Sequence, residues 1–164
     1  MVELLLRRGA ELGARAHRGS TPLIWAAGSG KTACASLLIK AGADVGAHDD
    51  AGYSTLHEAA RHGLLTIVKK LLSLKADPDA LSIGGDTPAT YSQRWWARYP
   101  QSNVSREKRA AVLDELHKAS LSNSRWHARK LAVMLLQRHA MGEDITRGTT
   151  RDSDGDVKFR YTDY

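Results

Sequence analysis

The sequence has little of what stabilises secreted proteins or holds proteins in membranes. It contains one cysteine, Cys34, so no disulfide can form within the chain. No stretch approaches the roughly 18 consecutive apolar residues of a transmembrane helix, and the N-terminus lacks the apolar core and cleavage site of a secretory signal. We therefore expect a protein of a reducing intracellular compartment, cytoplasmic by default.

The chain also lacks a complete catalytic or metal-binding motif. GSGKT at 28–32 is similar to a phosphate-binding loop, but Trp25 stands where that motif has its first glycine. In HEAARH the second histidine, His62, follows His57 by five residues, whereas a zinc-protease helix needs four. The aspartates of 152–156 have calcium-loop spacing without the glycine that such a loop requires. We expect no enzyme, no metal and no cofactor.

What the chain does contain is an internal repeat of 33 residues. Gly19, Gly52 and Gly85 each open a near-copy of the same segment: GSTPLIWAA, GYSTLHEAA and GDTPATYSQ. The same step relates a second set of segments, which are GAEL from Gly9, GADV from Gly42 and KADP from Lys75. A repeat of this length indicates that one small structural unit is stacked several times.

The residues of each copy predict a pair of helices. The first helix begins after a capping hydroxyl residue, which is Thr21, Ser54 or Thr87, and two of these are followed by proline at the first helical position. Gly30 and Gly63 end this helix. The second helix has a buried apolar stripe, formed in the middle copy by Leu64, Ile67, Val68, Leu71 and Leu72. Gly42 provides a left-handed C-cap, and Lys75 in the same position should cost some stability.

The period and the Thr-Pro-Leu-His-like signature resemble the ankyrin repeat, a β-turn followed by two antiparallel helices. The resemblance covers about residues 2–93. It implies an all-α repeat solenoid of helix-turn-helix units with hairpin-like loops. We assign 1–93 to the repeats, the first of them partial, because VELLLRRGAEL corresponds to a second helix without its first. We expect the chain to be part of a longer protein or a larger assembly.

After Gly85 the pattern decays. Trp96 stands where a glycine ends the first helix of the other copies, and the apolar residues of the next helix arrive 11 or 12 residues late, at Val112, Leu113 and Leu116. For 94–141 we predict a divergent fourth repeat with an insertion, then a separate capping helix that starts near Asn123 or Ser124. We predict that 142–164 is an extended tail. Alternation at Val157, Phe159 and Tyr161 indicates a strand with no partner in the chain, which could pair with another subunit.

The resemblance implies a function. Ankyrin-repeat proteins catalyse no reaction and bind protein partners through the hairpin tips and the concave face formed by the first helices. Carried over one repeat at a time, the implied binding residues are Trp25, His48, Tyr53, Glu58, Arg61, His62, Tyr91, Arg94 and Trp95. Aromatic and arginine side chains often anchor interfaces. We predict a protein–protein interaction or scaffold module.

The charge distribution supports an alternative. The chain carries +6, and between Arg94 and Arg138 ten lysines or arginines stand against three acids. A basic accessory subunit could contact an acidic protein, or RNA phosphates in a ribonucleoprotein assembly. The residues of this possible basic patch are Arg106, Lys108, Arg109, Arg125, Arg129 and Lys130. A solvated helical face accounts for most such runs, so protein binding remains the first prediction.

Overall fold

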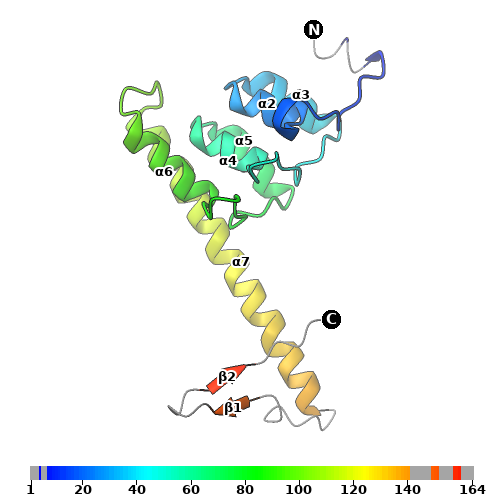
Figure 1. The fold of residues 1–164 in the computed structure, drawn as a ribbon, viewed down its shortest axis with the longest axis vertical. Coiled ribbons are helices and arrows are strands. Elements are labelled where there is room, and N and C mark those ends of the chain that lie inside the picture. The colour runs from blue at the N-terminus through cyan, green and yellow to red at the C-terminus, as the bar shows by residue number, and fades with distance from the viewer. Residues whose placement is uncertain (1–3, 5–6, 141–148, 152–156, 160–164) are drawn as a thin grey trace. The chain divides into compact units, whose positions relative to one another are not determined.

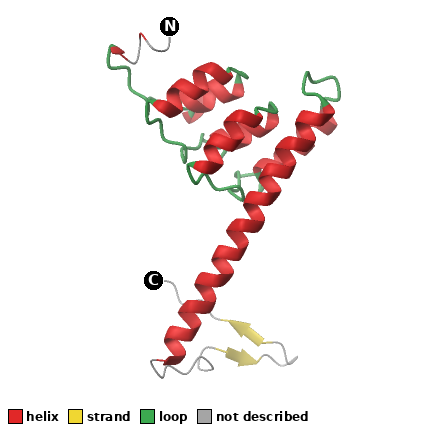
Figure 2. Cartoon of the chain, turned by 180° about the vertical axis from the view of Figure 1, so that it is seen from behind, coloured by secondary structure: helices red, strands yellow, loops and turns green. Residues whose placement is uncertain are grey.

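The computed structural model describes the backbone of residues 4, 7–140, 149–151 and 157–159, in two compact units, 1–123 and 124–164. The elements of the first unit are η1 (His17–Gly19), α2 (Pro22–Gly28), α3 (Thr32–Lys40), α4 (Thr55–Arg61), α5 (Leu65–Ser73) and α6 (Pro88–Arg98). Helix α7 (Arg106–Ala140) starts in the first unit and its backbone continues into the second. The second unit also contains the strands β1 (Thr149–Arg151) and β2 (Val157–Phe159), as Figure 2 shows.

The helices of the first unit are stacked as the repeat predicts. Figure 1 shows α2 with α3 and α4 with α5 as successive helical hairpins, and α6 beside α4. Helix α4 contacts both α2 and α6, and α3 contacts α5. The first helices therefore form one layer and the second helices another. The predicted all-α repeat fold is confirmed.

Local sequence signals set where each helix begins and how the chain turns. Thr21 Oγ1 accepts the Ile24 N–H at 3.4 Å, and Thr87 Oγ1 accepts the Thr90 N–H at 3.2 Å. Ser54 forms a capping box with His57. The residues with left-handed backbone recur with the repeat, at Gly19 (φ 68°), Gly52 (79°) and Gly85 (76°) and again at Gly9 (78°), Gly42 (88°) and Lys75 (66°). The predicted caps and turns are thus present.

One apolar core runs through the stack. It includes the fully buried side chains of Leu23, Leu56, Ile67, Val68 and Leu71, and it extends to Val112 and Leu116 of α7. Burial of each large apolar side chain stabilises the fold by roughly 1.5–3 kcal/mol. Because each repeat covers the apolar side of the next, stability depends on the contacts between repeats as well as on each hairpin.

The divergent fourth repeat has a longer first helix. Helix α6 has 11 residues, against 7 in α2 and in α4. Trp96, in place of the terminating glycine, is buried, and its Nε1 donates to the Arg61 carbonyl at 2.9 Å. The inserted loop, 99–105, is held by Arg109, which donates to the Val104 carbonyl at 2.9 Å and to Ser102 Oγ at 2.7 Å. Val104 of this loop also packs against the apolar core, so the insertion is part of the folded stack.

The prediction of a separate capping helix is wrong. Helix α7 is continuous from Arg106 to Ala140, with no break near Asn123 or Ser124. The Asn123 side chain does not start a new helix but donates from Nδ2 to Asp77 Oδ1 at 3.3 Å and Asp79 Oδ2 at 3.4 Å. Residues 106–140 contain no glycine or proline, and extending a helix costs less than nucleating another.

The prediction of a strand without a partner is also wrong. Strand β2 pairs antiparallel with β1, which places Thr149 opposite Phe159 and Arg151 opposite Val157. The adjacent threonines of β1 favour extended backbone, but three residues are too few to show alternation in a sequence. Tyr161 lies outside the described residues.

Candidate functional site

Several residues predicted to bind a partner meet on the first helices. The rings of Tyr53 and Tyr91 lie 4.4 Å apart, and those of Trp95 and Tyr99 lie 4.3 Å apart. The Arg61 guanidinium lies over the Trp95 ring, 4.5 Å from its centroid. We call these five side chains the aromatic ladder. Tyr99 was not among the predicted concave-face residues, because it follows the position at which the other repeats have already ended their first helix.

An ion pair ties the ladder to the stack. Arg61 donates from Nε and Nη2 to Glu58 Oε2, at 2.9 and 2.5 Å, and the two side chains are only 16% and 11% exposed. Arg61 Nη2 also donates to the Gly28 carbonyl at 3.3 Å, and the Tyr91 hydroxyl donates to Glu58 Oε1 at 3.5 Å. The pair therefore bridges α2, α4 and α6. Burial, assisted by the Glu58 charge, raises the pKa of Tyr91, so its hydroxyl keeps the proton it donates.

Other predicted residues are more accessible. Trp25 on α2 is 68% exposed. Arg94 on α6 is exposed and forms a salt bridge of 2.5 Å with the buried Asp86. His48 is exposed at a hairpin tip, where it forms an isolated β-bridge with Ser54. These positions offer side chains to a partner without any rearrangement of the core.

His62 follows the last residue of α4 and is half-buried. Its Nε2 has no hydrogen-bond partner among the described residues. Burial lowers the pKa of His62, and the positive charge of Arg61 lowers it further. His62 is therefore neutral at physiological pH and adds little charge to this face.

A groove adjoins the ladder at the α2 end. Its volume is about 480 Å³, and its lining includes His17, Arg18, Trp25, Asp49, Glu58 and Arg61. The lining mixes an exposed indole with charges of both signs. Such a groove can accept an apolar side chain of a partner next to polar groups.

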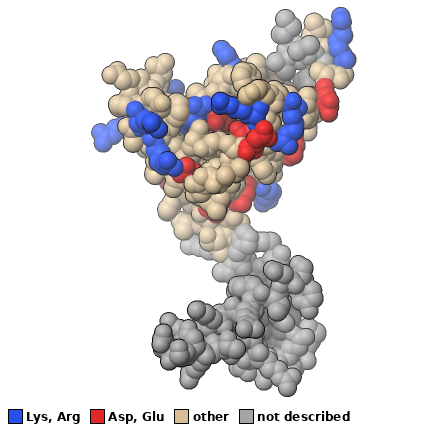
Figure 3. Space-filling view, viewed as in Figure 1, with Lys and Arg blue, Asp and Glu red and all other residues tan. Residues whose placement is uncertain are grey.

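The possible basic patch is only partly assembled in the described part of the chain. Arg106 and Lys108 are exposed, whereas Arg109 is partly buried and holds the inserted loop. Arg125, Arg129 and Lys130 belong to α7, but their side chains lie outside the described residues. On the face of the repeats that Figure 3 shows, basic and acidic side chains are interspersed.

The described residues hold neither a metal-binding cluster nor a helix suited to span a membrane. There, no three or more His, Cys, Asp or Glu side chains come together as a group that could hold a metal ion. None of the helices, over the residues described, combines the length and apolar character needed to cross a bilayer.

Comparison with known protein families identifies the repeats. The family model for ankyrin repeats, in three copies, matches residues 1–82, which is half of the 164-residue chain. No curated protein matches the chain. The matched span includes α2 to α5, whose stacked hairpins, capped helix starts and recurring left-handed glycines have been described above. The chain belongs to the ankyrin-repeat family.

Proposed function

We propose that this chain is a non-enzymatic module that binds a protein partner through the aromatic ladder, the adjoining groove and the divergent fourth repeat. Ankyrin repeats are in general protein–protein interaction modules and typically have no catalytic activity. The observation that carries the proposal is the ladder, in which aromatic rings and one arginine hold each other in place on the first helices. Side chains that are already ordered lose little entropy on binding.

We assign three roles to the predicted residues and Tyr99. Glu58, Arg61 and Tyr91 are tied to one another and maintain the shape of the face. Trp25, Arg94 and Tyr99 are exposed, and we assign the direct contacts to them and to Trp95. The partner-facing rim consists of His48, Tyr53 and His62. Tryptophan, tyrosine and arginine dominate binding energy at most interfaces.

The proposal includes an intracellular place of action and membership of a larger chain or assembly. The unpaired Cys34 supports the first point, because free thiols persist in reducing compartments. The exposed Trp25 supports the second, because the end of a repeat stack needs a cover over its apolar side.

Affinity capture tests the proposal. The tagged full-length chain is incubated with an extract of its source cells, and the bound proteins are quantified by mass spectrometry. Trp95→Ala combined with Tyr99→Ala should lower recovery of the specific partner at least about tenfold, because two anchoring side chains are lost. Thr66→Ala, at an exposed position of α5, is the matched control and should leave recovery unchanged.

Circular dichroism must show the same helical content for each variant. Tyr99→Ala alone, at an exposed position, covers the case in which the double variant unfolds. Equal recovery by Tyr99→Ala and Thr66→Ala would remove the ladder from the interface.

The same capture tests the RNA alternative. Protein partners that persist after nuclease treatment support the proposal. Loss of every partner with nuclease, and binding of RNA that weakens steeply with salt, would instead assign the chain to a ribonucleoprotein. In that case binding should depend on the exposed Arg106 and Lys108 and on Arg125, Arg129 and Lys130.

A further inference from the structure

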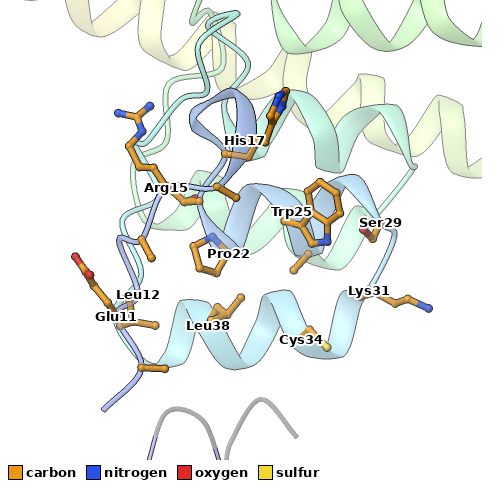
Figure 4. A pocket seen from close by; sticks show the side chains of 16 residues that line it. Glu11, Leu12, Arg15, His17, Pro22, Trp25, Ser29, Lys31, Cys34 and Leu38 are labelled. Carbon is orange, nitrogen blue, oxygen red and sulfur yellow. The ribbon is translucent and has the colours of Figure 1, made fainter. Parts of the chain in front are cut away.

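The end of the helix stack formed by α2 and α3 has an apolar hollow of about 740 Å³. Figure 4 shows Pro22 and Trp25 of α2 and Cys34 and Leu38 of α3 around it. We call this hollow the end pocket. Trp25 separates it from the groove beside the aromatic ladder, since this side chain lines both.

The residues of the end pocket have equivalents that are covered one repeat later. Trp25 is 68% exposed, whereas Glu58, 33 residues on, is 8% exposed. Cys34 is half-buried, whereas its equivalent Ile67 is fully buried. In the later repeat a neighbouring hairpin provides the cover, because α2 contacts α4 and α3 contacts α5. The end pocket therefore has the shape of a surface on which a helix packs.

We propose that the end pocket binds an amphipathic helix of a partner protein, with small and apolar residues on one face and acidic residues beside that face. Helices α2 and α3 have 7 and 9 residues, so two to three turns of the partner helix cover the pocket. The pocket shares no residue with the aromatic ladder, although Trp25 lines both the pocket and the adjoining groove. This inference therefore goes beyond the proposed function and can fail separately from it.

The interface between α2 and α4 indicates which partner residues fit the end pocket. There α2 approaches α4 through Gly28, and a Cβ at that position would lie 3.1 Å from Glu58 Oε2. In the end pocket Trp25 takes the place of Glu58 and is larger. The partner residue opposite Trp25 must therefore be glycine or alanine, with leucine-sized side chains next to it to fill the space over Cys34 and Leu38.

The charges around the pocket determine which charged residues the partner helix can carry beside its apolar face. Arg15, His17 and Lys31 line the pocket together with one acid, Glu11, and all four are exposed. Figure 4 shows Lys31 and Glu11 at opposite ends. Lys31 forms no salt bridge with another described residue. Arg15 already donates to the Gly19 and His48 carbonyls, so Lys31 provides the main attraction for acidic residues of the partner and repels a basic flank.

Fluorine NMR on the full-length chain labelled with fluorotryptophan tests the proposal. The probe is a synthetic helical peptide of about 15 residues, with leucine and alanine on one face and glutamate on the other. Trp25→Phe identifies the Trp25 resonance. Addition of the probe should shift this resonance until it saturates. A peptide of the same composition in scrambled order, and one with lysine in place of glutamate, should bind at least about tenfold more weakly.

A pair of variants at Ser29 provides the matched control. Ser29 lines the pocket, is exposed and follows the last residue of α2, so either substitution leaves the fold intact. Ser29→Glu should weaken binding of the acidic probe at least about fivefold, whereas Ser29→Lys should retain or strengthen it. The variant Trp95→Ala with Tyr99→Ala should bind the probe normally, which separates this inference from the proposed function.

Three results would overturn the proposal. The first is an unchanged Trp25 resonance, or equal shifts with the scrambled peptide. The second is equal binding by Ser29→Glu and Ser29→Lys. The third is a Trp25 resonance that shifts with protein concentration in the absence of the probe, together with a dimer in analytical ultracentrifugation. The pocket would then bind a second copy of the chain.

Discussion

Thr55 shows how one side chain departs from the pattern of its repeat. It occupies the first position of α4, where α2 and α6 have Pro22 and Pro88. Its side chain is fully buried, and its hydroxyl has no hydrogen-bond partner among the described residues. A buried hydroxyl without a partner costs about 1–3 kcal/mol. The middle repeat is therefore less stable at this position than its neighbours.

Thr55→Pro should raise the free energy of unfolding by about 1 kcal/mol. The backbone already suits proline, since the preceding Ser54 is extended (φ −84°, ψ 168°) and the first N–H of a helix needs no partner. Urea and thermal denaturation measure the change. Thr55→Val removes the hydroxyl without restricting the backbone and should give only part of the gain. A lower midpoint for Thr55→Pro would contradict this account of α4.

At the scale of the element, the second helices α3 and α5 are each followed by a left-handed residue. Gly9 and Gly42 adopt φ values of 78° and 88°, and Lys75 adopts 66° at the equivalent position after α5. Left-handed backbone costs a residue with a side chain roughly 1 kcal/mol, whereas glycine adopts it without strain. The end of α5 is therefore strained in a way that the end of α3 is not.

Lys75→Gly should remove this strain and stabilise the protein by about 0.5–1 kcal/mol. The Lys75 side chain is exposed, so few contacts are lost. Lys75→Ala keeps a Cβ at the same left-handed position and serves as the control, with little or no gain expected. Urea midpoints that rank alanine equal to glycine would show that the backbone at Lys75 is not the cause.

At the scale of the whole molecule, His57 links neighbouring repeats. Its Nδ1 accepts the Ser54 N–H at 3.1 Å, so the proton of the neutral ring is on Nε2, which donates to the Asp86 carbonyl at 3.0 Å. Burial lowers the pKa of His57, and the bond to the Asp86 carbonyl opposes that effect only in part. Protonation of Nδ1 would remove the acceptor that caps α4.

The stack should therefore lose stability in mild acid. The folded-state pKa values of His57 and His62 lie below the ordinary value of 6.5, so the unfolded chain binds protons first as the pH falls. The stabilisation is complete above pH 6.5 and is lost as the pH falls through the lowered pKa values. Urea unfolding at about pH 7.5, 6.5 and 5.5 measures the loss.

Variants assign this pH dependence to particular residues. His57→Gln should make the unfolding free energy less dependent on pH, although it lowers stability at neutral pH. His48→Gln, at an exposed hairpin tip, should leave the profile unchanged. A flat profile in the wild-type protein would show that neither buried histidine is held in its neutral form.

The sequence by itself determined the stacked helix pairs, because the signals that specify them are local. A capping bond such as that of Thr21 spans three residues, and a left-handed turn depends on a single glycine. The repeat also gave Trp25, Glu58 and Tyr91 equivalent positions on successive first helices, since residues one period apart occupy equivalent places in the stack.

Only the tertiary structure decided how those residues are used. It joined the Glu58–Arg61 pair of α4 to Gly28 and Tyr91 of the neighbouring repeats, brought Tyr99 onto the ladder and left Trp25 uncovered. It also kept α7 continuous past Asn123, whose side chain binds aspartates 44 and 46 residues away. The exposure of a side chain and its contacts across repeats depend on residues a repeat or more apart. Helix caps and the helical spacing of apolar residues depend only on neighbours within a few positions.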